Sequence, residues 1–250
     1  MQEEIKEFNP LGYKPVGKLL KSLAIPAIIA NLVNALYNVV DQIFIGQGIG
    51  YLGNAATNIA FPIITMCLAI GLTLGIGGAS NFNLELGKGY PEKSKHTAGT
   101  AASTLIIIGI ILCISVRIFL EPLMISFGAT DKILEYSMEY TGITSYGIPF
   151  LLFSIGVNPL VRADGNAKYS MIAIVIGAIL NTILDPLFMF VYNWGIAGAA
   201  WATVISQIIS ASLLLMYFPR FKSVKFSLND FIPQLHYLKR IISLGFASFI

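Results

Sequence analysis

The sequence predicts an all-α polytopic membrane protein built as a bundle of six transmembrane helices. Two observations support this prediction. Hydrophobic residues make up 56% of the chain and charged residues only 12%, which is about half the charged share of an ordinary soluble domain. The apolar residues also gather into runs of roughly 20 residues, the length that a helix needs to cross the hydrocarbon core of a bilayer.

The apolar runs define the expected spans in chain order. They cover about 16–46, 54–82, 97–120, 133–160, 169–192 and 196–218. Several exceed 20 residues, so we expect these helices to tilt or to project beyond the lipid. A seventh run opens at about Ile241 and is still apolar at Ile250, which predicts a chain that stops within a helix. The expected divisions are a six-helix lobe over 1–220, a cytoplasmic linker over 221–238 and the start of a seventh helix over 239–250.

The distribution of basic residues predicts how the bundle lies in the membrane. Fourteen of the sixteen Lys and Arg residues fall on one side, and only Arg117 and Lys132 fall on the other. Cytoplasmic loops carry such an excess of positive charge, so the N-terminus and the linker are expected on the cytoplasmic side of the cell membrane. Tyr192 and Trp194 on an outer loop suit the interfacial aromatic belt. Loop composition alone thus explains the net charge of +3, and we expect no nucleic-acid partner.

Several other classes of site are not expected from the sequence. Cys67 and Cys113 both lie within apolar runs, which is typical of packing residues and indicates neither a disulfide nor a metal site. A phosphate-loop interpretation of the glycines at 75–78 fails, because they lie inside an apolar helix with no strand before them. We therefore expect no enzyme and no organic cofactor.

The first span carries an unusual polar stripe. On a helix, Asn31, Asn34, Asn38 and Asp41 fall within roughly 80° of one another. A carboxylate at this depth is costly, and it normally faces a bundle interior or a water-filled cavity on a transport pathway. The alternative is that Asp41 snorkels to the membrane surface. That alternative fits poorly, because the asparagines continue along the same face.

A second intramembrane carboxylate, Asp185, follows Asn181 by one helical turn. Counting from the span ends at 1.5 Å per residue places Asp41, Asp185, Tyr140 and Thr203 at similar depth, about 8 to 11 Å inside the outer boundary. The sequence thus predicts one outer-half pocket whose oxygens suit a hard cation and whose paired acids suit a shared proton. The alternative is that these polar residues only form hydrogen bonds between helices. That role explains some of the asparagines and threonines, but it explains two buried acids poorly.

Four segments together resemble the multidrug and toxic compound extrusion (MATE) family, in the branch with an aspartate in the first span. These segments are NALYNVVDQIFIG (34–46), RADGNAKYS (162–170), ILNTILDPLF (179–188) and WGIAGAAWAT (194–203). The resemblance covers nearly the whole chain. It implies the N-terminal lobe of a two-lobe transporter plus the start of helix seven, with the C-terminal lobe as a missing partner. Family members export cationic and amphipathic compounds in exchange for H⁺ or Na⁺.

The resemblance also implies roles for particular residues. Asp41, Asn181, Asp185 and Thr203 match the cation-coupling site of the N-terminal lobe, and they would be the Na⁺ ligands of a sodium-coupled member. Asn34, Tyr37, Tyr140 and Asn158 match positions of the family's substrate cavity. We expect Asn38, from the polar stripe, to line the same cavity. Asn34 stands where a relative has glutamine, a mild departure. The expected partners are a small cationic or amphipathic substrate and the lipid bilayer, and the expected coupling ion is H⁺ or Na⁺.

Two other functions compete with a cation-coupled drug antiporter. A related flippase for lipid-linked saccharides would share the bundle but would need a more cationic cavity, and the expected spans hold no central Arg or Lys. An intramembrane aspartyl protease would use Asp41 and Asp185. It needs a glycine-rich context before its aspartate, whereas Asp185 lies in Ile-Leu-Asp-Pro, so the protease is the weaker alternative.

Overall fold

The computed structural model describes residues 15–246, in which all regular structure is helical. The helices are α2 (Val16–Gly48), α3 (Tyr51–Gly87), α4 (Pro91–Ile118), α5 (Leu120–Ser126), α6 (Asp131–Thr144), α7 (Ile148–Ala163), α8 (Ala167–Pro186), α9 (Gly195–Leu215) and α10 (Leu235–Phe246). Within this part of the chain, six helical segments are long and apolar enough to span a bilayer. The predicted six-helix membrane bundle is therefore confirmed.

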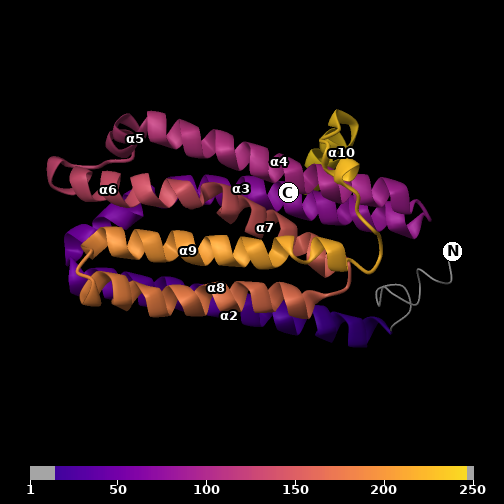
Figure 1. Ribbon diagram of the computed structural model, residues 1–250, viewed down its shortest axis with the longest axis horizontal. Coiled ribbons are helices and arrows are strands. Elements are labelled where there is room, and N and C mark those ends of the chain that lie inside the picture. The colour runs from indigo at the N-terminus through magenta and orange to yellow at the C-terminus, as the bar shows by residue number, and fades with distance from the viewer. Residues whose placement is uncertain (1–14, 247–250) are drawn as a thin grey trace.

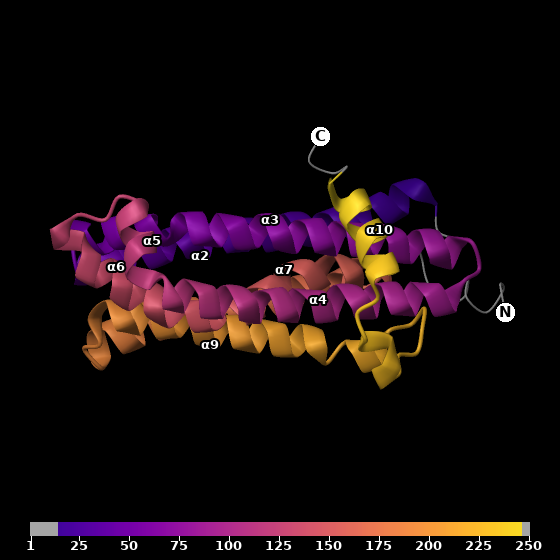
Figure 2. The ribbon, with the colours of Figure 1, turned by 90° about the horizontal axis from the view of Figure 1, so that it is seen from above.

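The long helices run side by side along the axis of the bundle, and α10 crosses them near one end (Figures 1 and 2). Apolar side chains of α2 that face away from the bundle recur every three or four residues: Ile28, Leu32, Leu36, Val39 and Ile43. This spacing is one face of a helix, and such a face suits lipid. The opposite side of α2 packs chiefly against α8. One side of this helix therefore faces lipid, and the other faces the bundle.

Two of the predicted spans are broken next to a proline. The span expected at 133–160 divides at a 3₁₀ turn, Ser145–Gly147, and Pro149 lies in the first turn of α7. The span expected at 169–192 changes into a π-turn, Leu187–Val191, directly after Pro186. A proline provides no backbone N–H for the regular ladder and clashes with the preceding turn, so the helix changes geometry there. The short helix α5 was not among the expected elements.

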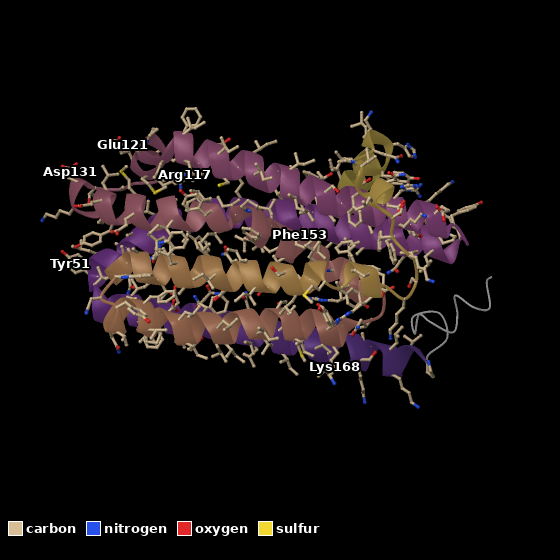
Figure 3. The ribbon with its side chains drawn as sticks, viewed as in Figure 1. Tyr51, Arg117, Glu121, Asp131, Phe153 and Lys168 are labelled. Carbon is tan, nitrogen blue, oxygen red and sulfur yellow. The ribbon has the colours of Figure 1, made fainter. Side chains whose placement is uncertain are left out.

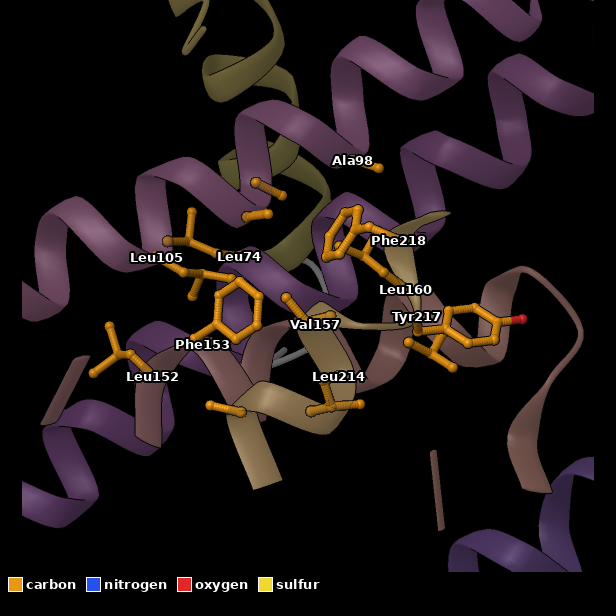
Figure 4. Close-up of a cluster of buried hydrophobic side chains, with 14 of the residues drawn as sticks. Leu74, Ala98, Leu105, Leu152, Phe153, Val157, Leu160, Leu214, Tyr217 and Phe218 are labelled. Carbon is orange, nitrogen blue, oxygen red and sulfur yellow. The ribbon is translucent and has the colours of Figure 1, made fainter. Parts of the chain in front are cut away.

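The core of the bundle lies among α3, α4, α7 and α9. Figure 4 shows Leu105 from α4, Leu152 and Leu160 from α7, and Leu214 from α9 converging there, and all four are fully buried. Burying an aliphatic side chain of this size stabilises a fold by about 1.5–3 kcal/mol in water. Within lipid, close van der Waals packing supplies most of the association instead. The core therefore depends on tight contact between helices.

The backbones of α3 and α7 are in close contact. A Cβ atom added at Gly75 would lie 2.6 Å from the carbonyl oxygen of Gly156 and 2.7 Å from its Cα. We expect Gly75→Ala to destabilise the lobe by about 1–3 kcal/mol, because both opposing atoms are backbone and the helices must separate. A Cβ atom added at Gly87 of the same helix would have nothing within 4 Å, so Gly87→Ala is the control. Thermal unfolding in detergent measures both variants, and equal midpoints would contradict the prediction.

The segment expected as a linker, 221–238, is folded against the bundle. A short 3₁₀ turn, Leu228–Phe231, packs on α4, and α10 begins at Leu235, before the expected start at 239. Asp230 accepts hydrogen bonds from the Ser227 backbone at 2.7 Å and from its hydroxyl at 3.0 Å. Lys95 and His96 of α4 also contact its carboxylate. The expected end of the seventh run at Ile250 lies outside the described residues, and the three-part division stays a prediction.

Candidate functional site

A cavity of about 640 Å³ opens along the inner side of α2. Its walls come from α2, α3, α7, α8 and α9, and they combine aliphatic side chains with hydroxyl, amide and guanidinium groups. The polar and aromatic lining residues are Asn31, Asn34, Tyr37, Ser154, Asn158, Arg162, Asn181, Thr203, Ser206, Gln207 and Ser210. A mostly apolar wall with a few convergent polar groups is typical of sites for amphipathic small molecules.

Two carboxylic acids meet at one end of this region. Asp41 of α2 is 7% exposed and Asp185 of α8 is fully buried, and their carboxyl groups are within hydrogen-bonding range of each other. The packing of α2 against α8 brings them together. Asn181, one turn before Asp185, donates to its Oδ1 at 3.2 Å. The same amide lies 3.4 Å from the Thr203 hydroxyl of α9.

Two tyrosines surround the acid pair. Tyr140 of α6 is 5% exposed; it hydrogen-bonds Thr203 and lies close enough to both carboxyl groups to interact with them electrostatically. Tyr37, one turn before Asp41 on α2, lies close to the same two acids and lines the cavity. Tyr140 and Thr203 also line a smaller adjoining pocket of about 40 Å³. The pair is therefore enclosed by four helices rather than exposed to lipid.

The oxygen atoms at this site suit a proton or a hard cation. Asp41 Oδ1, Asp185 Oδ2 and Asn181 Oδ1 are buried and have no hydrogen-bond partner within the described part of the chain. Buried polar atoms normally have a partner, so each exception needs an explanation. Two carboxylates and an amide oxygen are ligands that Na⁺ accepts, and a shared proton satisfies two acids equally well. Residues 15–246 contain no cluster of three or more His, Cys, Asp or Glu side chains, which a transition metal would need.

The structure divides the predicted site residues into three groups. Asp41, Asn181, Asp185 and Thr203 come together with Tyr140, as just described. Asn34, Tyr37 and Asn158 line the large cavity, and Asn158 lies on α7 toward its end at Ala163. Asn38 lies outside the cavity, against our expectation: it is exposed, lines a separate groove, and donates to the Asn34 backbone carbonyl at 2.7 Å. Its helix turns it away from the cavity although it lies near Asn34 in angle.

Sequence reasoning missed one charged member of the cavity wall. The apolar run predicts a span that ends before Arg162, but α7 continues through this residue, and its side chain lines the cavity. Its guanidinium donates to Asn158 Oδ1 at 2.6 and 3.0 Å and to the Ser170 hydroxyl at 3.1 Å. The expected spans hold no central Arg or Lys, but the cavity extends to the last turn of α7 and so includes Arg162 in its wall. The spacing of Asn158 and Arg162, one turn apart on one helix face, was the available signal.

Known proteins share both the sequence pattern and the fold. The multidrug export protein MepA of Staphylococcus haemolyticus is 25% identical over 240 residues, covering 94% of this chain and 52% of the relative. MepA of Staphylococcus aureus is 25% identical over 238 residues, with the same coverage. The chain thus spans about half the length of these curated relatives.

Solved structures give the same result. A MOP superfamily transporter from Pyrococcus furiosus has a TM-score of 0.87 at 28% identity, covering 98% of this chain and 54% of that one. A multidrug resistance MATE family transporter in an outward-facing conformation has a TM-score of 0.85 at 29% identity, covering 92% and 51%. The model of the MatE family matches residues 26–187, more than half of the sequence. With six apolar helices and this match, the chain belongs to the MatE family of membrane transporters.

Proposed function

We propose that this chain forms one lobe of an antiporter that exports cationic or amphipathic compounds in exchange for H⁺ or Na⁺. The observation that carries the proposal is the buried contact between Asp41 and Asp185 beside a large, mostly apolar cavity. Interhelical hydrogen bonding alone explains this contact poorly, because two carboxylates repel each other when both are ionised in a low dielectric. Binding of an ion or a proton relieves this repulsion, so the lobe has two states, one with the acid pair occupied and one with it empty.

The positions of the two acids explain how ion binding is coupled to the shape of the lobe. Asp41 lies on α2, which contains Pro26, and Asp185 lies one residue before Pro186 and the π-turn. Both helices therefore have a break in regular hydrogen bonding where they bend at low cost. Occupation of the acid pair draws α2 and α8 together, and an empty pair drives them apart. Such a difference in affinity between two shapes is what any ligand-driven change requires.

The substrate class follows from the cavity wall and from the relatives. Aliphatic side chains of α3 and α7 face hydroxyl and amide groups of α8 and α9, as an amphipathic molecule requires. The MepA relatives are named multidrug export proteins, which agrees with a permissive cavity. Because this chain spans about half of their length, we propose that it acts together with a second six-helix lobe.

A flippase for lipid-linked saccharides is the second candidate, and Arg162 is the observation in its favour. The guanidinium gives the cavity one cationic group, although the rest of the polar lining is neutral. Transport of a lipid-linked saccharide in vesicles, compared with efflux of a cationic dye, separates the two functions. The antiporter requires dye efflux without saccharide transfer.

Transport by the assembled transporter tests the main proposal. Proteoliposomes containing this lobe and its second lobe are loaded with a cationic dye, and efflux is followed under an imposed Na⁺ gradient or an imposed pH gradient. We expect efflux to follow one of these gradients and to stop when that gradient is collapsed. Efflux that is the same with and without both gradients would refute the antiporter.

The orientation of the lobe is tested by labelling. Tyr51, Glu121 and Asp131 lie at one end of the bundle, and Lys168 lies away from them, where α8 begins (Figure 3), in line with the charge asymmetry of the loops. We expect an impermeant thiol reagent on intact cells to label Trp194→Cys but not Lys93→Cys, because Lys93 lies at the basic end. Both positions are on the surface. Replacing Cys67 and Cys113 by alanine removes background labelling, and the reverse pattern would overturn the orientation.

A further inference from the structure

We infer that Arg162 makes one end of the cavity a binding site for an anionic group, a carboxylate or a phosphate, on an amphipathic molecule. The Arg162 side chain lines the cavity close to the connection between α7 and α8. The inference rests on the proposed function only in treating the cavity as a substrate site. It adds that the substrates recognised there include molecules with a negative group.

The first argument is that the guanidinium has no anionic partner in the described part of the chain. Its Nε and one terminal nitrogen donate to the neutral oxygens of Asn158 and Ser170. No carboxylate of residues 15–246 lies within ion-pair distance of it. A partly buried charge is costly unless it is paired. An arginine also presents its donors in a planar fork that matches a carboxylate or a phosphate.

The nearest acid in the sequence is already engaged elsewhere. Asp164 is fully buried, and it accepts hydrogen bonds from the Tyr217 hydroxyl at 2.8 Å and from two backbone N–H groups of the segment after α9, each at 2.9 Å. Its two oxygens are therefore directed toward that segment rather than toward the cavity. Arg162 keeps its full charge for whatever enters the cavity.

The second argument is the separation of the two charged ends. Ser170, which contacts Arg162, and Asp185, which contacts Asp41, lie on the same helix. Fifteen residues separate them in the sequence, which corresponds to about 22 Å along a regular α-helix. At this distance the acid pair neither neutralises Arg162 nor competes for its ligand. A molecule with an apolar body therefore meets a cationic group at one end of the cavity and an acidic pair beyond the other.

The third argument is that Asn158 and Ser170 hold the guanidinium in place. Asn158 Oδ1 accepts from Arg162 and from the Ser170 hydroxyl, and its amide donates to the Ser170 backbone carbonyl at 3.3 Å. Asn158 and Ser170 are both buried. A positioned donor loses less entropy when a ligand binds than a mobile one does. The other terminal nitrogen, Nη1, has no hydrogen-bond partner among the described residues and remains free for a ligand.

The test compares two dyes that differ only in the anionic group. One is a rhodamine with a free carboxylate, and the other is its methyl ester; both carry the same xanthylium cation. Fluorescence anisotropy measures their binding to the full chain in lipid-free detergent, with no ion gradient. We expect the wild-type chain to bind the acid about tenfold more tightly than the ester, the ratio that one charge-assisted hydrogen-bonded pair supplies.

Three variants assign the preference to Arg162. Arg162→Gln should lower the ratio to about one while leaving ester binding unchanged. Arg162→Lys should keep part of the preference, because it keeps the charge but loses the planar fork. Lys168→Gln is the matched control: it removes the same charge from an exposed position outside the cavity, and it should keep the wild-type ratio. Circular dichroism verifies that each variant retains the helical fold.

Added lipid identifies the source of the anionic group. If a membrane phospholipid is the natural ligand, phosphatidylglycerol should displace the acid dye from the wild-type chain but not change ester binding to Arg162→Gln. If a soluble substrate is the source, phosphatidylglycerol should leave the acid dye bound. An unchanged ratio in Arg162→Gln, or equal binding of both dyes by the wild-type chain, would overturn the inference and leave Arg162 as a brace between α7 and α8. Binding of neither dye would instead overturn the proposed function of the cavity.

Discussion

Asp41→Asn and Asp185→Asn should each abolish ion-driven export in the assembled transporter while leaving membrane insertion intact. An amide has nearly the shape of a carboxyl group, so the packing of α2 on α8 is preserved, but it takes up no proton near neutral pH and lacks the negative charge that attracts a cation. Each change removes the free-energy difference between the empty and occupied pair. Allosteric coupling of this kind is typically about 1–3 kcal/mol, which corresponds to about 5–150-fold in affinity. We expect the gradient-driven accumulation ratio to fall by a factor in that range.

The same efflux assay gives the control and the opposing outcome. Asn38→Ala changes a polar residue of the same helix that lies outside the cavity, and its efflux should resemble that of the wild-type protein. Asn181→Ala should weaken the dependence on the ion without abolishing export, because it removes one supporting amide from Asp185. If either aspartate variant exports the dye normally, with unchanged pH and Na⁺ dependence, that carboxylate is only structural and the shared site is wrong.

Asp164→Ala should cause the largest loss of stability, about 3–5 kcal/mol in the free energy of unfolding. The carboxylate accepts three hydrogen bonds, from the Tyr217 hydroxyl and from the backbone N–H groups of Lys222 and Ser223. A hydrogen bond to a charged group contributes about 1.5–3 kcal/mol, and loss of the acceptor leaves buried donors without a partner. The segment after α9 would lose its main polar anchor to the α7–α8 loop. Chemical unfolding in detergent, followed by circular dichroism, measures the change.

Limited proteolysis shows where the stability is lost. In Asp164→Ala the chain should be cleaved within 221–231 faster than in the wild-type protein, before the helices of the bundle are cut. Tyr217→Phe removes one of the three bonds to this carboxylate and should cost about 1.5–3 kcal/mol. Asp131→Ala, at an exposed helix start, is the control and should stay within about 0.5 kcal/mol of wild type. A wild-type cleavage pattern in Asp164→Ala would show that the aromatic side chains of this segment hold it without the carboxylate.

The closeness of Asp41 and Asp185 was predictable, whereas the position of Arg162 on the cavity wall was not. Span ends are set by lipid thickness, so counting residues from them places two carboxylates at one level. Arg162 follows one turn after Asn158, beyond the apolar run that predicts the span. Charge alone does not distinguish an arginine in a cytoplasmic loop from one on the last turn of a helix. Only the continuation of α7 to Ala163 decides it.

The fold of the segment expected as a linker was also not predictable from the sequence. Its polar composition indicated a connection between two bundles, but Phe218, Phe221, Phe226 and Phe231 cluster there with short ring distances, such as 5.0 Å between Phe221 and Phe226. These aromatic side chains are spread among charged residues in the sequence. Their common location depends on the Asp164 anchor and on the α4 surface, which are both distant along the chain.

By itself the sequence determined the membrane class, the six spans and the two intramembrane acids, because crossing hydrocarbon requires long apolar helices and makes each charge within them conspicuous. The tertiary structure decided which side of each helix faces the cavity. Asn34 and Asn38 differ by only about 40° around α2, yet the packing of α2 on α8 places Asn34 on the cavity wall and leaves Asn38 on an outer groove. That boundary is set by the neighbouring helix, and no local pattern in the sequence of α2 records where its neighbour lies.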